Sequence, residues 1–196
     1  MNIEVFVSYI QQSKLDIDIC ALTTTVYELR NKDNGVTVSN IGGWQSTDFL
    51  PAFGGISSDP NFVNLVSGIR DATNMYHQKM EFKKTLELVI DNIWVNINGN
   101  GHSNESHVHP QSVLSGVFYL TDSATPISFV HPYPDINTYY WPENSIENSN
   151  KYNSSSYDIL PEKNTLVLFP SWLSHKVLEH KSDNDRISIS FNTKLQ

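Results

Sequence analysis

The chain of 196 residues is 39% hydrophobic and 11% aromatic, so it is long and apolar enough to bury one core and lacks the composition of a disordered protein. Its formal net charge of -8 (13 basic residues against 21 acidic ones) and its scattered lysines argue against nucleic acid as a partner. No apolar run reaches the roughly 20 residues of a membrane span, the first residues lack the features of a signal peptide, and Cys20 is the only cysteine, so we expect a soluble cytoplasmic protein without disulfides.

Two helices are predicted in the first 84 residues, after a short strand expected over residues 1–9. The first helix covers residues 16–31 and stops before the turn Asn34-Gly35; its apolar residues recur at near 3.6-residue spacing, namely Ile19, Leu22, Val26 and Leu29. The second covers residues 60–80 and carries the apolar stripe Phe62, Leu65, Val66, Ile69, Thr73 and Tyr76. Between them, the glycine pair in residues 39–46 indicates either the wall of a pocket or a structural turn anchored by Trp44.

From residue 85 the periodicity changes from helical to extended. One or two strands are expected over residues 86–98, and a turn at residues 98–101 leads into a strand that carries His107. Further strands are expected over residues 113–120, 127–130, 165–169, 174–178 and 186–195. This order predicts a mainly β protein, an antiparallel sandwich or jelly roll backed by the N-terminal helices, in one domain with helical support over 1–84 and a β core over 85–196.

Residues 131–158 are rich in Pro, Tyr, Asn and Ser and show no period. A long irregular segment inside a compact domain is usually functional or disordered, and its aromatic residues favour an ordered lid or substrate wall. The candidate substrate contacts are Tyr139, Tyr140, Trp141 and Trp44, for each of which packing is the simpler alternative.

Two histidines at a spacing of two indicate half of a metal site. Side chains at this spacing point to the same face of an extended strand, so His107 and His109 can share one ion. His175, near the start of a later strand, offers a third nitrogen ligand. Three such ligands leave positions open for substrate and oxygen, a set suited to Fe(II), Zn(II) or Mn(II).

The last expected strand carries a candidate carboxylate clamp. Its alternation places Ile187, Ile189 and Phe191 on one face, and on the other Arg186, Ser188, Ser190 and Asn192. The guanidinium of Arg186 can make a bidentate contact with a carboxylate, to which the Ser188 hydroxyl adds a hydrogen bond. The apolar face can pack under the helices, which leaves the polar face for the mouth of the barrel.

These motifs resemble those of the Fe(II)/2-oxoglutarate-dependent oxygenase superfamily, and within it a group of oxygenases found in bacteria and phages. The resemblance covers most of the chain and rests on residues 107–110 (HVHP), 114–120 (LSGVFYL), 168–175 (LFPSWLSH) and 186–192 (RISISFN). Residues 39–46 (SNIGGWQS) support the subgroup only. The resemblance implies a double-stranded β-helix, a form of jelly roll, with Fe(II) between its two sheets and 2-oxoglutarate as cosubstrate.

The resemblance also implies a role for each matching position. His107 is similar to the first iron ligand and His175 to the distal one, while Arg186 and Ser188 are similar to the site for the far carboxylate of 2-oxoglutarate. Tyr119 stands on a strand where members often place a hydroxyl that contacts the same carboxylate. The implied reaction uses O2 to convert 2-oxoglutarate to succinate while hydroxylating or otherwise oxidising a C–H bond of an unidentified substrate.

The chain departs from most of the superfamily at His109, where an Asp or Glu is usual. Three neutral imidazoles leave the double charge of the iron uncompensated until the dianionic cosubstrate binds. We expect His109 to be the third ligand. The alternative gives His109 a role outside the ligand set and assigns ligation to a neighbouring group, namely Asp122, Glu105 or His102.

Two other classes of protein fit the sequence. A cupin-like metalloenzyme would share the jelly roll and the histidine pair but would not need Arg186 and Ser188 on the inner face. A nonenzymatic jelly-roll binding module, such as a capsid accessory protein or a carbohydrate binder, would leave the histidines without metal. The sequence fixes neither the prime substrate nor the oligomeric state, for which a dimer is one option, and the subgroup is compatible with a phage origin.

Overall fold

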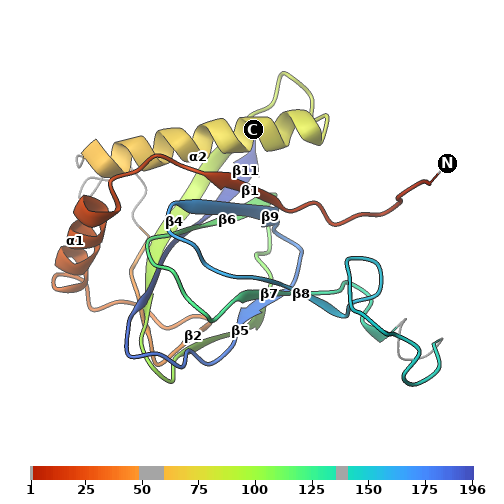
Figure 1. Ribbon diagram of the computed structural model, residues 1–196. Coiled ribbons are helices and arrows are strands. Elements are labelled where there is room, and N and C mark those ends of the chain that lie inside the picture. The colour runs from red at the N-terminus through yellow and green to blue at the C-terminus, as the bar shows by residue number, and fades with distance from the viewer. Residues whose placement is uncertain (1, 49–59, 136–140) are drawn as a thin grey trace.

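The computed structural model describes residues 2–48, 60–135 and 141–196. These residues form two antiparallel sheets that face each other, with both helices packed on the outer side of one sheet (Figure 1). The expected mainly β jelly roll, backed by N-terminal helices, is therefore confirmed. No helix in the described part of the chain is long and apolar enough to cross a membrane.

The two helices form where the apolar spacing predicts them. Helix α1 spans Ile19–Arg30 and helix α2 spans Pro60–Lys79. Asp18 caps α1, because its Oδ1 accepts a hydrogen bond from the Ala21 N–H at 3.1 Å and so satisfies a donor that the helix leaves free. The core between the helices and the sheet below them includes Leu22, Val26, Leu65, Ile69, Leu114, Phe118, Ile187 and Ile189.

The strands divide between the two sheets in a way that interleaves distant parts of the chain. Within the described residues the helix-side sheet has the order β1 (Gln11–Lys14), β9 (Thr165–Pro170), β6 (Leu114–Tyr119), β11 (Arg186–Leu195), β4 (Leu88–Asn98), β3 (Trp44–Gln45). The facing sheet has the order β2 (Asn40–Ile41), β5 (Ser103–His107), β10 (His175–Val177), β7 (Ile127–Val130), β8 (Ser156–Ile159).

Alternation along the central strands decides which side chains enter the space between the sheets. On β11, Ile187 and Ile189 pack toward the helices, while Arg186 and Ser188 line the cavity between the sheets. Strand β6 does the same with Phe118 on the helix side and its neighbours on the inner side. The polar inner face of β11 thus lies opposite the strands that carry the histidines.

The strand expected over residues 1–9 is wrong. Residues 2–9 pair with no other strand, and the first ladder begins at Gln11, opposite Leu168 of β9. Four apolar residues of this segment remain exposed, namely Ile3, Val5, Phe6 and Val7, with Val5 at 65% and Phe6 at 102%, while Tyr9 packs partly against the core. The apolar residues do alternate along this segment, but within the described chain no strand pairs with it. A β-strand needs a paired neighbour to be stable, so the pattern alone is not enough.

The segment over residues 131–158 does not cover the inner cavity in the part that the structure describes. Its last residues begin β8, and residues 141–155 extend away from the end of the sandwich (Figure 1). None of its described residues lines either pocket, and Trp141 is 36% exposed. Tyr139 and Tyr140 lie outside the described residues. The described residues of this segment therefore do not support its prediction as a lid or substrate wall.

Candidate active site

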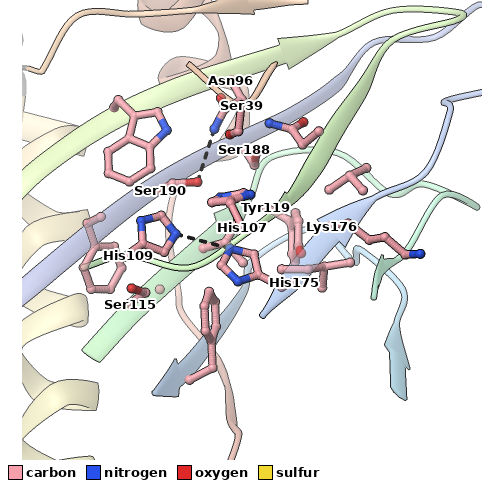
Figure 2. A pocket seen from close by; sticks show the side chains of 18 of the residues that line it. Ser39, Asn96, His107, His109, Ser115, Tyr119, His175, Lys176, Ser188 and Ser190 are labelled. Atoms are coloured by element: carbon pink, nitrogen blue, oxygen red, sulfur yellow. Dashed lines mark hydrogen bonds between the residues drawn. The ribbon is translucent and has the colours of Figure 1, made fainter. Parts of the chain in front are cut away.

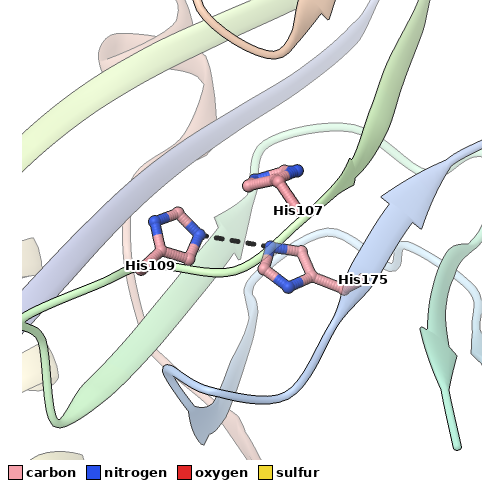
Figure 3. A group of neighbouring side chains, drawn as sticks. All are labelled: His107, His109 and His175. Atoms are coloured by element: carbon pink, nitrogen blue, oxygen red, sulfur yellow. Dashed lines mark hydrogen bonds between the residues drawn. The ribbon is translucent and has the colours of Figure 1, made fainter.

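Strand pairing brings the three histidines together between the sheets. His107 is the last residue of β5 and His175 the first of β10, and the two are direct partners in the ladder that joins these strands. His109 lies two residues past the end of β5, where its N–H donates to the Ser171 carbonyl at 2.9 Å. Figure 3 shows the three rings converging from these two segments.

Backbone carbonyls fix two of the rings so that the same nitrogen of each is free. The Nδ1 of His107 lies 2.7 Å from the Glu105 carbonyl, and the Nδ1 of His175 lies 2.9 Å from the Leu173 carbonyl. A carbonyl can only accept, so Nδ1 carries the proton in both rings and Nε2 keeps its lone pair. This orientation by a carbonyl behind the ring is the usual arrangement of a histidine that binds metal through Nε2.

The distances between the nitrogens fit a single ion. The Nε2 atoms of His109 and His175 are 3.2 Å apart, and the ligand atoms of all three histidines lie within 4.8 Å of one another. Two nitrogens at right angles about an ion, each about 2.1 Å from it, lie about 3 Å apart. Among the described residues no other group of His, Cys, Asp or Glu brings three ligand atoms this close. The donor set therefore fits a divalent transition metal.

Burial keeps the imidazoles of His109 and His175 neutral. It lowers the pKa of His109 to about 3, and the neighbouring His175 and His107 act in the same direction. Burial also lowers the pKa of His175 to about 4, against the opposing effect of the Leu173 carbonyl and with His107 adding to the depression. Both rings are thus unprotonated at neutral pH, which is the form that binds metal.

A buried guanidinium lines the same cavity. Arg186 is 3% exposed, its Nε donates to the Thr125 carbonyl at 3.3 Å, and among the described residues it has no carboxylate partner. Burial lowers its pKa, an effect that Tyr119 opposes. A buried cation without an anion is costly, so this environment favours an anionic ligand that enters the cavity.

The Tyr119 hydroxyl is the second group that lacks a partner. It is fully buried and makes no well-formed hydrogen bond among the described residues, although the guanidinium carbon of Arg186 lies 5.2 Å from its ring centroid. Burial raises the pKa of Tyr119, and the charge of Arg186 works against that rise. Ser188, 2% exposed, pairs with Tyr119 across the ladder and lines the same cavity (Figure 2). Together they offer a carboxylate one charged and two neutral donors.

Two lining residues on β4 escaped the sequence analysis. Asn96 is 6% exposed, donates from Nδ2 to the Ser190 hydroxyl at 3.2 Å, and leaves its Oδ1 buried without a partner among the described residues. The ring of Trp94 lies 5.9 Å from that of His109, between centroids, and lines both the inner cavity and an open groove outside it. The signal that could have found them is the even-numbered set Asn92, Trp94, Asn96 and Asn98, which alternates with apolar residues.

Several other candidates lie away from this cavity. Trp44 packs on the helix-side core and donates from its indole to the Asp33 carbonyl at 2.9 Å, so it anchors a structural turn. The segment around it is also a pocket wall, because Ser39 lines the inner cavity and Ser39, Gln45 and Ser46 line the open groove outside it. Two of the three alternative ligands have other hydrogen-bond partners. Asp122 accepts from the Lys163 N–H, His102 accepts from the Gly99 N–H, and the Glu105 side chain is exposed.

A jelly roll with three converging imidazoles and a buried cationic pocket between its sheets has the form of a mononuclear metal enzyme that binds an anion. The family model described as "Putative 2OG-Fe(II) oxygenase" matches residues 92–192, more than half of the chain. The chain therefore belongs to this family of Fe(II)- and 2-oxoglutarate-dependent oxygenases. Its metal is Fe(II), and its cosubstrates are 2-oxoglutarate and O2. This assignment decides against the cupin-like and the nonenzymatic alternatives.

Solved structures of similar fold agree with this family. The collagen prolyl hydroxylase of Paramecium bursaria Chlorella virus-1, in complex with 2-oxoglutarate, aligns with a TM-score of 0.62 at 13% identity over 94% of this chain and 95% of its own. A prolyl-4-hydroxylase from Pseudomonas putida gives 0.57 at 14% identity over 95% and 92%. HygX from Streptomyces hygroscopicus, with nickel, 2-oxoglutarate and hygromycin B bound, gives 0.59 at 12% identity over 95% and 82%. No curated protein matches the sequence.

Proposed function

We propose that the protein is a hydroxylase in which His107, His109 and His175 hold Fe(II). In this proposal Arg186, with Ser188 and Tyr119, receives the far carboxylate of 2-oxoglutarate. One observation carries it: the same cavity between the sheets is lined by three converging imidazoles and by a buried guanidinium that has no anionic partner among the described residues. 2-Oxoglutarate matches both features, because it has a carboxylate at one end and a metal-binding 2-oxo acid at the other.

The protein's own groups contribute binding, orientation and exclusion of water. Bound Fe(II) supplies the activation of O2 that couples decarboxylation of 2-oxoglutarate to oxidation of a C–H bond. The imidazoles hold the metal without adding negative charge, so the charge of the site is balanced by the cosubstrate. Arg186 fixes one end of 2-oxoglutarate through a charge-assisted pair, and burial strengthens that pair by keeping water away from it. Phe169, whose ring centroid lies 4.7 Å from that of His175, closes the apolar side.

Hydroxylation is the outcome we favour for the substrate. Two of the similar structures are named prolyl hydroxylases, and nothing in the described cavity suggests a second cofactor. The test begins with 2-oxoglutarate titrated into the anaerobic Fe(II) protein while the metal-to-ligand charge-transfer absorption is followed. Admission of O2 should then yield succinate, and a hydroxylated product should gain the mass of one oxygen atom. Absence of the absorption band in the parent protein would overturn the assignment of these residues.

A further inference from the structure

A chain of four hydrogen-bonded polar side chains runs from the protein interior to the surface beside the histidines. The Ser171 and Ser115 hydroxyls are 2.8 Å apart, and the Ser115 hydroxyl lies 2.6 Å from Asn192 Oδ1. Asn192 Nδ2 donates in turn to Asn92 Oδ1 at 2.9 Å. The inner three residues are at most 5% exposed, while Asn92 is only partly buried.

The outer end of this chain opens on a groove of about 770 Å³ that passes the metal centre. Asn92 and Asn192 line the groove, and so do Trp94, His107 and His109, which also line the inner cavity. A substrate that lies in the groove can therefore reach the histidines without entering the cosubstrate pocket. The groove is continuous with the proposed metal site, which makes it the candidate binding site for the prime substrate.

The hydrogen-bonding needs of the buried groups fix the donor-to-acceptor direction along these four side chains. The Ser171 hydroxyl is completely buried, and among the described residues Ser115 is its only side-chain partner, so its proton must go to Ser115. Ser115 must then donate to Asn192 Oδ1, which turns Asn192 Nδ2 toward Asn92 and makes the Asn92 oxygen the acceptor. Reversing both amides would leave the Ser171 proton buried without an acceptor. The amide group that Asn92 presents to the groove is therefore its NH2 donor.

The charges of the groove restrict what this donor can bind. Asp48, Asp91 and Glu105 line it, and Lys194 is 2.8 Å from Asp91. One Asp48 oxygen accepts the Ile93 N–H at 2.9 Å, but its charge remains. An excess of negative charge disfavours a carboxylate or phosphate at the same place. The acceptor that suits the Asn92 donor is thus an uncharged oxygen.

We propose that Asn92 recognises an amide carbonyl of the substrate, so that the groove takes a peptide or another secondary amide. This inference rests on the proposed function and names the substrate class of that site. Asn92 acts as a specificity-determining residue, and Ser115 acts as a positioning residue, because its hydroxyl donates to Asn192 Oδ1 and so fixes the orientation of both amides. The Ser171 carbonyl also accepts the His109 N–H at 2.9 Å, so the same segment holds both the donor and a proposed metal ligand in register. In this proposal, Asn92 holds the amide carbonyl of the substrate, and so positions the C–H bond that reacts.

The test uses the Zn(II)-loaded protein with 2-oxoglutarate bound, so that ligand binding is observed without turnover. The probe is a panel of the twenty amino acids blocked as N-acetyl N′-methylamides, with the matching N-acetyl amino acids as free carboxylates. The affinity of each protein for each probe is measured by isothermal titration calorimetry. In the parent, the ¹⁵N-labelled side-chain NH2 signal of Asn92, assigned by its disappearance in Asn92→Asp, reports contact with the ligand. The variants compared with the parent are Asn92→Asp, Ser115→Ala and, as a matched control on an exposed face of α2, Asn64→Asp.

In the parent, blocked amides should shift the Asn92 signal and bind more tightly than their carboxylate counterparts. Asn92→Asp replaces the donor with an acceptor and should weaken the amides by about tenfold or more. Ser115→Ala removes the hydroxyl that fixes the direction and should weaken them severalfold, although Ser115 does not line the groove, whereas Asn64→Asp should bind as the parent does. Equal affinity in Asn92→Asp or in Ser115→Ala, tighter binding of the carboxylates, or no binding of any amide would overturn the inference. If the parent binds neither metal nor 2-oxoglutarate, the proposed function fails and this inference fails with it.

Discussion

The guanidinium of Arg186 and the ring of Tyr119 lie one over the other, with 5.2 Å between the guanidinium carbon and the ring centroid. Both side chains are almost completely buried; among the described residues the Tyr119 hydroxyl has no hydrogen-bond partner and Arg186 has no carboxylate partner. The cation–π contact compensates part of the cost of burying the guanidinium. Both residues line one cavity, which therefore favours an anionic ligand.

Removing the guanidinium should weaken 2-oxoglutarate binding and spare the metal. A charge-assisted, bidentate pair contributes roughly 1.5–3 kcal/mol, so Arg186→Ala should raise the dissociation constant by about tenfold to a hundredfold. Arg186→Lys keeps the charge but loses the fork, and we expect an intermediate value. Anaerobic titration by the charge-transfer band measures both, with Arg70→Ala on the exposed side of α2 as the control. Equal affinity in the parent and Arg186→Ala would show that the carboxylate binds elsewhere.

Tyr119→Phe should weaken the binding of 2-oxoglutarate without lowering the free energy of unfolding. The substitution removes a buried hydroxyl that has no partner among the described residues, so the free energy of unfolding should stay level or rise. Binding of 2-oxoglutarate should weaken by about fivefold to tenfold, the effect of one lost hydrogen bond. Tyr76→Phe is the matched control, because its hydroxyl lies 3.3 Å from the Tyr9 carbonyl and its loss should lower stability without changing binding. Urea unfolding and the titration together give both quantities, and an unchanged 2-oxoglutarate affinity in Tyr119→Phe would remove this hydroxyl from the pocket.

The ligand set is tested one histidine at a time. His107→Ala and His175→Ala each remove one of three nitrogens and should reduce Fe(II) affinity severely, whereas His131→Ala, outside the cluster, should not. His109→Asp restores the carboxylate of the more usual triad and should retain iron. Metal content after anaerobic dialysis measures each variant. Tight iron binding by both alanine variants would place the metal elsewhere, and loss of iron from His109→Asp would mean that the pocket accepts only imidazole.

Gly116 on β6 marks a point where the core has no spare room. A Cβ at this position would overlap the ring of Phe191, which is fully buried, and would lie 2.8 Å from Leu168 Cδ2. Gly116→Ala should therefore destabilise the protein by about 1–3 kcal/mol through overpacking. Gly68→Ala in α2 is the comparison, since its Cβ meets only the end of Leu15 at 3.1 Å and alanine favours a helix. Urea unfolding decides the matter, and equal stability of Gly116→Ala and the parent would mean that Phe191 can move aside.

The sequence predicts most of the fold because its periods are strong where packing is strong. The alternation over residues 186–191 gives both faces of β11, since Ile187, Ile189 and Phe191 meet the helix core while Arg186, Ser188 and Ser190 line the cavity. Helix α2 follows its stripe for the same reason. The spacing of His107 and His109 also anticipates that their rings converge, although His109 reaches the cavity from a turn rather than from the strand.

What the sequence does not predict depends on pairing and on hydrogen-bond direction. Val5 and its neighbours alternate like a strand, yet their pattern does not say that no partner strand lies beside them. The sequence around Trp44 does not show whether this side chain faces a pocket or the core, and in the structure its indole donates to the Asp33 carbonyl. The proposed role of Asn92 depends on the hydrogen bond that the Ser115 hydroxyl donates to Asn192, and no local sequence pattern records such a relation.

The pairing of His175 with His107 has a consequence for folding as well as for catalysis. Because these residues are direct partners across β10 and β5, the distance between their rings is set by strand register. A slip of one residue between these strands would turn one imidazole to the opposite face of the sheet. An ion that requires both nitrogens then binds only the correctly registered chain and stabilises it by mass action. Bound Fe(II) should thus favour the native register of β5 and β10 and raise the free energy of unfolding.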